Sequence, residues 1–202
     1  MSQRAITVGV FDGVHIGHQF LIDNLITIAS NNSLTSLIIN FELLENKHKD
    51  SIKQNPSVRR TSPCRGEASS WETQDPLLTF IKGELDKSFS FKLLTDQRTK
   101  EKKLRSLNTD EVLTIPLTQD FMNRSAVDFL EYLLNDLQMK ILVVGDDFAF
   151  GKDRVGNINW LKEHSLMRSF ELIVIPRLVV HEHIISSTFL RTLDPESRSK
   201  YQ

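Results

Sequence analysis

The stretch GVFDGVHIGH at residues 9–18 joins a hydrophobic run to a glycine-containing turn and then to two histidines three residues apart. The hydrophobic run extends over residues 6–11 and predicts a short strand. The dipeptide Asp12-Gly13 is typical of a turn. Residues 19–30 carry apolar side chains at helical spacing and predict a helix. The chain is therefore expected to pass from strand to turn to helix within a few residues.

The two histidines of this stretch, His15 and His18, fall at the entrance of the expected helix. Backbone N–H groups are unpaired at a helix N-terminus and the helix dipole is positive there, so an anion is favoured. Gly17 has no side chain, which lets a phosphate approach the backbone. The stretch therefore predicts a phosphate-binding turn. A surface turn with two solvated histidines is the alternative interpretation.

Composition and charge favour a single soluble domain of ordinary size. The chain has 202 residues, of which 40% are hydrophobic, and a formal net charge of −1. This balance gives no sign of a nucleic-acid partner, so any affinity for nucleotides must be local. No apolar run is long enough to span a membrane. The single cysteine, Cys64, cannot form an internal disulfide, so we expect a cytoplasmic protein.

Short β-branched or leucine-rich runs alternate with helical patterns along the chain. Such runs suit strands that are buried on both faces. The expected strands cover residues 6–11, 36–41, 111–115, 141–144 and 171–175, and the expected helices cover 19–30, 99–107, 125–137 and 157–167. This order predicts an α/β domain with a mostly parallel five-stranded sheet flanked by helices. Ligands of such sheets bind beyond the carboxyl ends of the strands, where His15 and Asp146 would converge.

The segment at residues 45–90 has a different character. Residues 45–75 are polar, contain prolines and show neither helical nor strand periodicity, which predicts a loop. Residues 76–89 have leucine and isoleucine at helical spacing and predict a short helix that returns to the domain.

Three motifs in sequence order give the chain a resemblance to a known family. They are GVFDGVHIGHQ at 9–19, VVGDDF at 143–148 with Phe150-Gly151-Lys152 and Gly156-Asn157, and ISST at 185–188 with Arg191. Together they resemble the FMN adenylyltransferase domain of bacterial FAD synthetases, in the superfamily of nucleotidyltransferases with a HIGH-type signature. The resemblance implies a Rossmann-like domain that transfers AMP from ATP to FMN, giving FAD and pyrophosphate.

The resemblance also implies roles for individual residues. His15, His18 and Arg191 would act on the triphosphate during transfer. The remaining ATP-binding residues would be Gly9, Phe11, Asp12, Gly17, Ser186, Ser187 and Thr188, and the FMN-binding residues would be Phe41, Phe148 and Asn157. Mg²⁺ is expected as a cofactor that screens the triphosphate.

Several of these residues have a second interpretation from local structure. Asp12, Asp146 and Asp147 are available as Mg²⁺ ligands, with Asp147 at the head of the second motif, but each could equally cap a turn. Asn157 could contact flavin, cap the following helix, or do both.

The sequence departs from the family pattern at positions near the expected flavin site. Phe41-Glu42 is followed by Leu43-Leu44 where the family usually has a proline-histidine-proline string, and Ala149 stands where an arginine is common. Two alternatives therefore stay open. One is a nucleotidyltransferase for another phosphorylated acceptor, and the other is a flavin-nucleotide binding protein without turnover.

The expected domain organisation is an adenylyltransferase-like domain at residues 1–193, with the polar insertion at 45–90, and a polar tail at 194–202. The family usually continues into a riboflavin kinase domain, which these residues do not contain. We therefore expect either that a separate riboflavin kinase supplies FMN or that the sequence ends at a domain boundary.

Overall fold

A computed structural model describes residues 2–43 and 93–202 of the chain. The predicted insertion at 45–90, including its loop at 45–75, its short helix at 76–89 and Cys64, lies outside the described residues.

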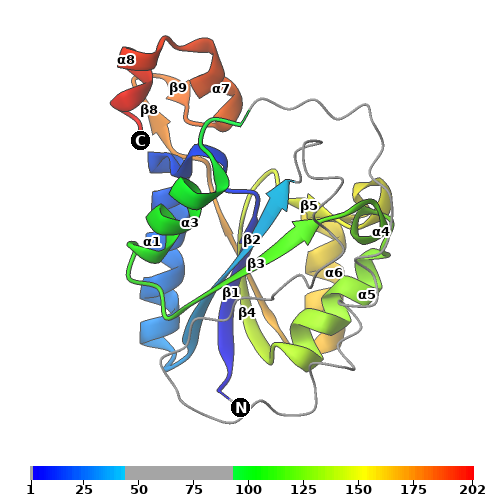
Figure 1. The fold of residues 1–202 in the computed structure, drawn as a ribbon. Helices are drawn as coiled ribbons and strands as arrows, with labels where there is room; N and C mark the ends of the chain where they lie inside the picture. The colour runs from blue at the N-terminus through cyan, green and yellow to red at the C-terminus, as the bar shows by residue number, and fades with distance from the viewer. Residues whose placement is uncertain (1, 44–92) are drawn as a thin grey trace.

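Five parallel strands form the central sheet of the molecule (Figure 1). They are β1 (Arg4–Gly9), β2 (Thr35–Leu43), β3 (Glu111–Leu117), β4 (Met139–Gly145) and β7 (Glu171–Ile175). Their order in the sheet is β3-β2-β1-β4-β7, so the chain winds outward from β1 first on one side and then on the other. The predicted α/β class and the five-stranded parallel sheet are confirmed.

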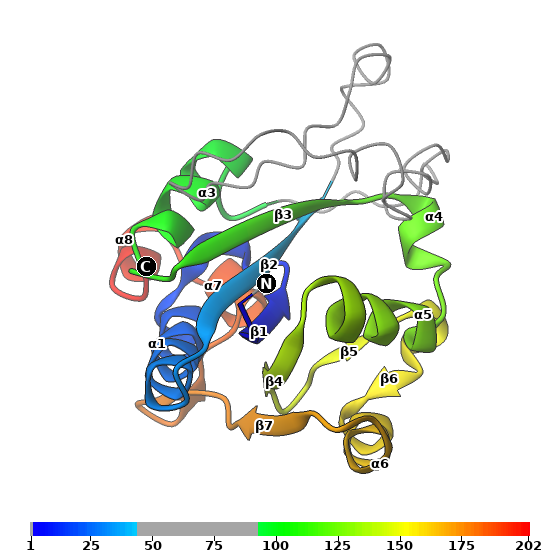
Figure 2. The ribbon, with the colours of Figure 1, turned by 90° about the horizontal axis from the view of Figure 1, so that it is seen from below.

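Helices cover both faces of this sheet (Figure 2). One face carries α1 (Ile16–Asn31) and α3 (Gln97–Arg105). The other carries α5 (Ala126–Glu131), a π-helical turn at Tyr132–Asp136, and α6 (Ile158–Arg168). The shorter elements are η1 (Asp12–Val14), α4 (Gln119–Met122), β5 (Ala149–Phe150), η5 (Lys152–Arg154), β6 (Gly156–Asn157), β8 (Val179–Val180), β9 (His183–Ile184), α7 (Ser187–Thr192) and α8 (Pro195–Ser199).

The side chains of β2 show why the strands lack an alternating sequence pattern. Leu37 and Ile39 pack into the cluster under α5 and α6, while Ile38 packs into the cluster under α1 and α3. Successive side chains of a strand point to opposite faces, and here both faces are covered. Each fully buried aliphatic side chain contributes about 1.5–3 kcal/mol, so the apolar runs stabilise both layers together.

Two element boundaries near the site differ from the sequence prediction. Strand β1 ends at Gly9 and not at residue 11, because Phe11 has a left-handed backbone with φ of 48°. Helix α1 begins at Ile16 and not at residue 19, because His15 is its N-cap. His18 therefore lies inside the first turn of the helix.

Gly151 offers a test of this backbone arrangement. Its φ of 73° and ψ of 169° lie in a region that is essentially restricted to glycine, and an added Cβ would lie 2.7 Å from the backbone nitrogen of Ala126. We expect Gly151→Ala to lower the free energy of unfolding by at least about 2 kcal/mol in urea denaturation. The exposed neighbour Lys152 supplies the control, and Lys152→Ala should stay within about 0.5 kcal/mol of the wild type. Equal stability of both variants would contradict the placement of this loop against α5.

Candidate active site

The turn between β1 and α1 has an unusual backbone. Phe11, Gly13 and Val14 have φ values of 48°, 83° and 43°. Left-handed conformations cost a non-glycine residue of order 1–3 kcal/mol, and a β-branched residue such as valine adopts them least readily. The surrounding structure must therefore hold this turn in place.

Donors from distant parts of the chain bind the carbonyl groups of the turn. Lys100 Nζ donates to Val10 O at 2.9 Å, Ser187 Oγ to Asp12 O at 3.1 Å, Gln202 Nε2 to Gly13 O at 3.5 Å, and Gln19 Nε2 to Val14 O at 3.0 Å. Phe11 O accepts from Val14 N at 3.1 Å within the turn itself. These donors come from α3, α7, the last residue and α1, so one short turn connects elements that are far apart in sequence.

Asp12 is the charged residue of this turn and is 4% exposed. Its Oδ1 accepts a hydrogen bond from Leu94 N at 2.9 Å, and its Oδ2 forms an ion pair with Arg191 Nη2. Both carboxylate oxygens thus have partners within the protein. This geometry favours the turn-organising interpretation of Asp12 over a role as a metal ligand.

His15 is held by contacts to both of its ring nitrogens and is 3% exposed. Its Nδ1 accepts from His18 N at 3.3 Å, and its Nε2 lies 3.3 Å from Ser187 Oγ. This network assigns the proton to Nε2, because Nδ1 acts as an acceptor and Ser187 Oγ donates onward to Asp12 O. Burial, followed by the charge of Arg191, lowers the pKa of His15 to about 4. The ring is neutral at pH 7.

His18 stacks on His15 with 3.6 Å between ring centroids, and the Phe11 ring packs against it at 5.4 Å. Its Nδ1 is buried without a hydrogen-bond partner. Burial, then the charges of His15 and Lys100, hold the pKa of His18 well below its ordinary value. His18 is therefore also neutral at pH 7, and unlike His15 its ring nitrogens are not engaged by other described residues.

The two glycines predicted at the ATP site are packed closely. A Cβ on Gly17 would lie 3.0 Å from the carbonyl oxygen of Ile185 and 3.1 Å from the His15 ring. A Cβ on Gly9 would lie 3.1 Å from the Phe11 ring. Gly17 was expected to make room for a phosphate, and the structure adds that it lets the segment before α7 approach α1.

A cavity of about 280 Å³ opens beside the first turn of α1. It lies among the carboxyl ends of β4 and β7, the segment before α7, and α1. Its lining residues are His15, Gly17, His18, Phe20, Leu21, Gly145, Asp147, Ile175, Pro176, Arg177, Leu178, Ile185, Ser186, Ser187 and Thr188. The first and third motifs, which are about 170 residues apart in sequence, thus share one cavity. We call it the α1 cavity.

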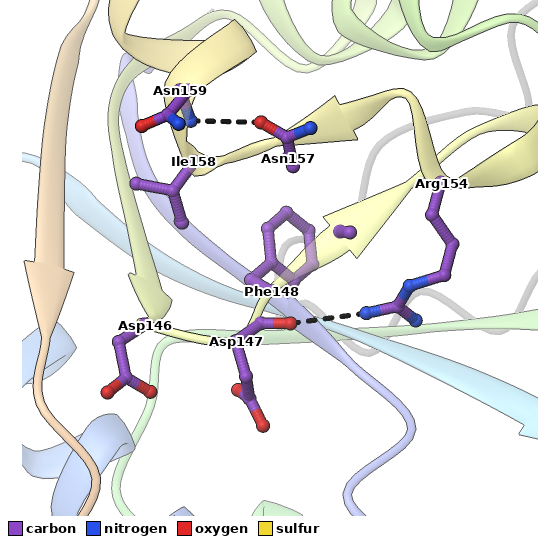
Figure 3. Close-up of a pocket in the computed structure, with 8 residues that line it drawn as sticks. Asp146, Asp147, Phe148, Arg154, Asn157, Ile158 and Asn159 are labelled. Carbon is purple, nitrogen blue, oxygen red and sulfur yellow. Dashed lines mark hydrogen bonds between the residues drawn. The ribbon is translucent and has the colours of Figure 1, made fainter.

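A second cavity, of about 550 Å³, lies beside β5 and β6, and we call it the β5–β6 cavity (Figure 3). Its lining residues are Asp146, Asp147, Phe148, Ala149, Arg154, Asn157, Ile158 and Asn159. Asp147 lines both cavities, which places them next to each other.

Asn157 caps α6 from the wall of the β5–β6 cavity. Its Oδ1 accepts from Asn159 N at 3.0 Å and from Trp160 N at 3.1 Å, which confirms the N-cap interpretation (Figure 3). Asn157 is at the same time one of the lining residues of this cavity. On the other side of Phe148, Arg154 Nη2 donates to Asp147 O at 3.3 Å.

Phe41, expected to contact FMN, packs in the hydrophobic core of the described residues. Its ring is 5.1 Å from Phe121 and 5.9 Å from Phe129, and the residue is 8% exposed. It is not among the residues that line either cavity. Strand β2 alternates its side chains, and the register that buries Leu37 and Ile39 directs Phe41 to the same packed face.

Three features of the site were not found by sequence reasoning. Lys100 is 2% exposed beneath the turn. It lies four residues before the buried Leu104 on the same helix, and this spacing could have indicated that the two side chains share a buried face. Arg177 forms an ion pair with Asp146 at 2.8 Å between the two cavities. Residues 194–202, expected as a polar tail, contain α8, and Tyr201 O accepts from the backbone N–H of Ile16 at 2.8 Å.

Acidic and histidine side chains do not gather into a metal cage in this part of the molecule. Within residues 2–43 and 93–202, no group of three or more His, Cys, Asp or Glu side chains is arranged to hold a metal ion. In the same ranges, no helix is both long and apolar enough to cross a membrane.

The family model described as FAD synthetase matches residues 1–61 and 75–189, which include the first two motifs, the ISST segment of the third and the residues that line both cavities, but not Arg191. The chain belongs to the FAD synthetase family. It is 29% identical over 200 residues to the bifunctional riboflavin kinase/FMN adenylyltransferase of Buchnera aphidicola from Acyrthosiphon pisum, covering 98% of this chain and 52% of that protein. The corresponding protein of Buchnera aphidicola from Schizaphis graminum is 32% identical, with coverage of 94% and 50%.

A more distant family member is the FAD synthetase of Listeria monocytogenes, 23% identical over 186 residues and covering 92% of this chain and 61% of that protein. The chain thus spans about half the length of the bifunctional relatives. Among solved structures, one titled as a macrolide-efflux protein from Streptococcus pneumoniae aligns with a TM-score of 0.62 at 20% identity, covering 95% of this chain and 51% of that one. That likeness supports the fold alone.

The lowered histidine pKa values predict a pH-dependent stability for this FAD synthetase family member. Unfolding restores the ordinary pKa of 6.5 to His15, so the unfolded chain binds more protons between pH 6.5 and 4. The contribution of the neutral His15 ring to the free energy of unfolding is complete above pH 6.5 and is lost as the pH falls toward 4. We expect the free energy of unfolding to fall by about 2 kcal/mol between pH 7 and pH 5 for this reason.

Urea denaturation at the two pH values measures this effect. His15→Asn keeps an N-cap oxygen but cannot titrate, so its stability should fall about 2 kcal/mol less than that of the wild type. The exposed His181 supplies the control, and His181→Asn should keep the wild-type pH dependence. An unchanged dependence in His15→Asn would show that His15 is not buried as a neutral ring.

Proposed function

We propose that this chain is an ATP:FMN adenylyltransferase that forms FAD and pyrophosphate. The observation that carries the proposal is the pair of adjoining cavities, one beside the neutral histidines and one beside Asn157, with Asp147 on the wall of both. The triphosphate of ATP is assigned to the α1 cavity and FMN to the β5–β6 cavity. Membership of the FAD synthetase family and the names of its bifunctional relatives support the same assignment.

In the proposed reaction, a phosphate oxygen of FMN attacks the α-phosphorus of ATP. A new bond forms between that oxygen and phosphorus, the bond from the α-phosphorus to its bridging oxygen breaks, and pyrophosphate leaves with the electron pair. The protein positions the two substrates and stabilises the charge that develops on pyrophosphate, and no covalent enzyme intermediate is required. His18 serves here as a neutral donor, because its pKa is held low by burial.

The third motif is proposed to bind the polyphosphate from the opposite wall of the α1 cavity. Ser186, Ser187 and Thr188 line this wall, and Ser187 also contacts His15. Arg191 follows on α7 and is oriented toward the turn by its ion pair with Asp12. A guanidinium fork binds both carboxylate and phosphate oxygens, so Arg191 is proposed to contact the polyphosphate from beside the turn.

Mg²⁺ is proposed as a cofactor that is held mainly by the substrate phosphates. Mg²⁺ commonly binds through one or two carboxylates together with phosphates and water, so it needs no cage of protein ligands. Asp147 fits this role, because its carboxylate belongs to a residue that lines both cavities. When bound, the ion would neutralise charge on the triphosphate and on the leaving pyrophosphate.

FMN is proposed to come from a separate riboflavin kinase, in a cytoplasmic setting. The described residues form one α/β unit, and the matched family model covers it as far as residue 189. With riboflavin in place of FMN, the 202-residue chain should consume no ATP and form no FMN.

Ala149 is the observation that favours the alternative function, in which a phosphorylated acceptor other than FMN receives AMP. It lines the β5–β6 cavity at a position where the family often carries arginine, so a cationic contact to the acceptor is missing there. Incubation with ATP, Mg²⁺ and a panel of phosphorylated acceptors decides the question, with pyrophosphate release and product mass as readouts. FAD is the expected product. A different adduct, or binding of FMN and ATP with no pyrophosphate, would overturn the proposal.

Replacement of His18 tests its proposed role in the transition state. We expect His18→Ala to lower kcat by at least about 100-fold and to change the Kd of FMN by less than about threefold, because the donor is needed most as charge moves onto pyrophosphate. His181→Ala, at an exposed histidine, should match the wild type. Unchanged turnover in His18→Ala would remove this residue from the mechanism.

Two further variants separate the proposed subsites. Asn157→Ser keeps an N-cap oxygen for α6 and removes the amide, so it should raise the KM of FMN about tenfold at constant thermal stability. Arg191→Lys keeps a cation opposite the buried Asp12 and removes the forked donor, so it should raise the KM of ATP about tenfold. Parallel losses for both substrates in either variant would contradict the assignment of two subsites.

A further inference from the structure

Lys100 lies beneath the turn on α3 and is 2% exposed. Its Nζ donates to Val10 O at 2.9 Å and to Phe41 O at 3.2 Å. These two carbonyls belong to the carboxyl ends of two neighbouring strands, β1 and β2. The side chain thus reaches from a helix on one face of the sheet to the edge at which both cavities lie.

The ladder between β1 and β2 ends just before these carbonyls. The last paired residues are Gly9 and Asn40, so Val10 and Phe41 lie one residue beyond the β1–β2 pairing. The chain after Val10 enters the left-handed turn, where strand pairing can no longer fix its position. The ammonium group replaces the missing ladder bonds with two hydrogen bonds of its own.

Packing alone does not explain the buried ammonium group of Lys100, because burial of a charge is unfavourable. An isolated buried charge costs several kcal/mol, whereas an apolar side chain of similar length would fill the same space at no such cost. Burial lowers the pKa of Lys100 to about 8, while the nearby carboxylates of Asp12 and Glu42 act in the opposite direction. The two carbonyls and the two acidic neighbours therefore offset only part of the effect of burial.

Lys100 also affects the histidine pair through its charge. Its ammonium is one of the groups that disfavour a proton on His18, after burial and after His15. Removing the charge should therefore raise the pKa of His18.

We propose that Lys100 is a positioning residue for adenylyl transfer: it ties the carboxyl ends of β1 and β2 together through Val10 O and Phe41 O and so places the turn and His18 for the triphosphate. Lys100 is not among the residues that line either cavity, so it acts through the turn and does not touch the reacting groups. The inference rests on the proposed function and names a contribution of α3 that none of the three motifs contains.

Two substitutions separate hydrogen bonding from charge. Lys100→Met removes both, whereas Lys100→Gln removes the charge and keeps two N–H donors on a side chain that is one bond shorter. Lys102, exposed on the same helix, supplies the controls Lys102→Met and Lys102→Gln. The readouts are kcat, the KM values for ATP and FMN, thermal stability, and the titration and backbone amide shifts of residues 13–18 by NMR.

We expect Lys100→Met to lower kcat at least tenfold with the KM of FMN changed less than threefold, and Lys100→Gln to recover at least a third of wild-type kcat. Both should raise the pKa of His18, and the Lys102 variants should match the wild type. Wild-type turnover in Lys100→Met, or a folded Lys100→Gln no better than Lys100→Met, would overturn the proposal. If Lys100→Met does not fold, Lys100→Gln alone decides. A kcat of Lys100→Gln within threefold of the wild-type value supports the proposal, and a tenfold loss of kcat overturns it.

The NMR readout distinguishes this proposal from the proposed function. If the wild type forms no FAD, the function fails, but the amide shifts of residues 13–18 still report the position of the turn. Shifts displaced in Lys100→Met and restored in Lys100→Gln would support positioning by Lys100. Shifts that match the wild type in Lys100→Met would overturn it.

Discussion

The left-handed turn at residues 11–14 is the constraint on which the site depends, because its backbone is unfavourable unless other elements hold it. The carbonyl groups of the turn and of the preceding Val10 accept hydrogen bonds from α1, α3, α7 and the end of the chain. The turn therefore fixes the relative positions of the histidines, the third motif and the C-terminal segment within the α/β fold.

The electrostatics of the site follow from burial more than from net charge. The chain carries a formal charge of only −1, yet Lys100 and Arg191 both lie near the turn with Asp12 close to each of them. Cations of this kind, together with burial, keep His15 and His18 unprotonated. A neutral imidazole keeps one N–H donor and adds no charge, so it can bind a phosphate without competing with Mg²⁺.

Sequence reasoning predicted the fold and most of the residues around the cavities, and its failures have physical causes. Apolar runs identified the five strands because both faces of the sheet are buried, and the three motifs brought His18, Ser186 and Asn157 to the cavities. The packing of Phe41 on Phe121 and Phe129 was not foreseen, because register decides which face a strand residue joins and a single sequence does not reveal it. Lys100 and the C-terminal segment were missed because their contacts are with backbone groups, which leave no residue pattern.

The central claim is that the triphosphate occupies the α1 cavity and FMN the adjoining β5–β6 cavity. A crystal structure of the chain with FMN, Mg²⁺ and α,β-methylene ATP tests it most directly, because this analogue cannot release pyrophosphate. The account predicts phosphate oxygens within hydrogen-bond distance of a ring nitrogen of His18, the flavin ring beside the amide of Asn157, and the FMN phosphate directed toward the α-phosphorus past Asp147. A nucleotide bound away from His18, or a flavin ring in the α1 cavity, would contradict it.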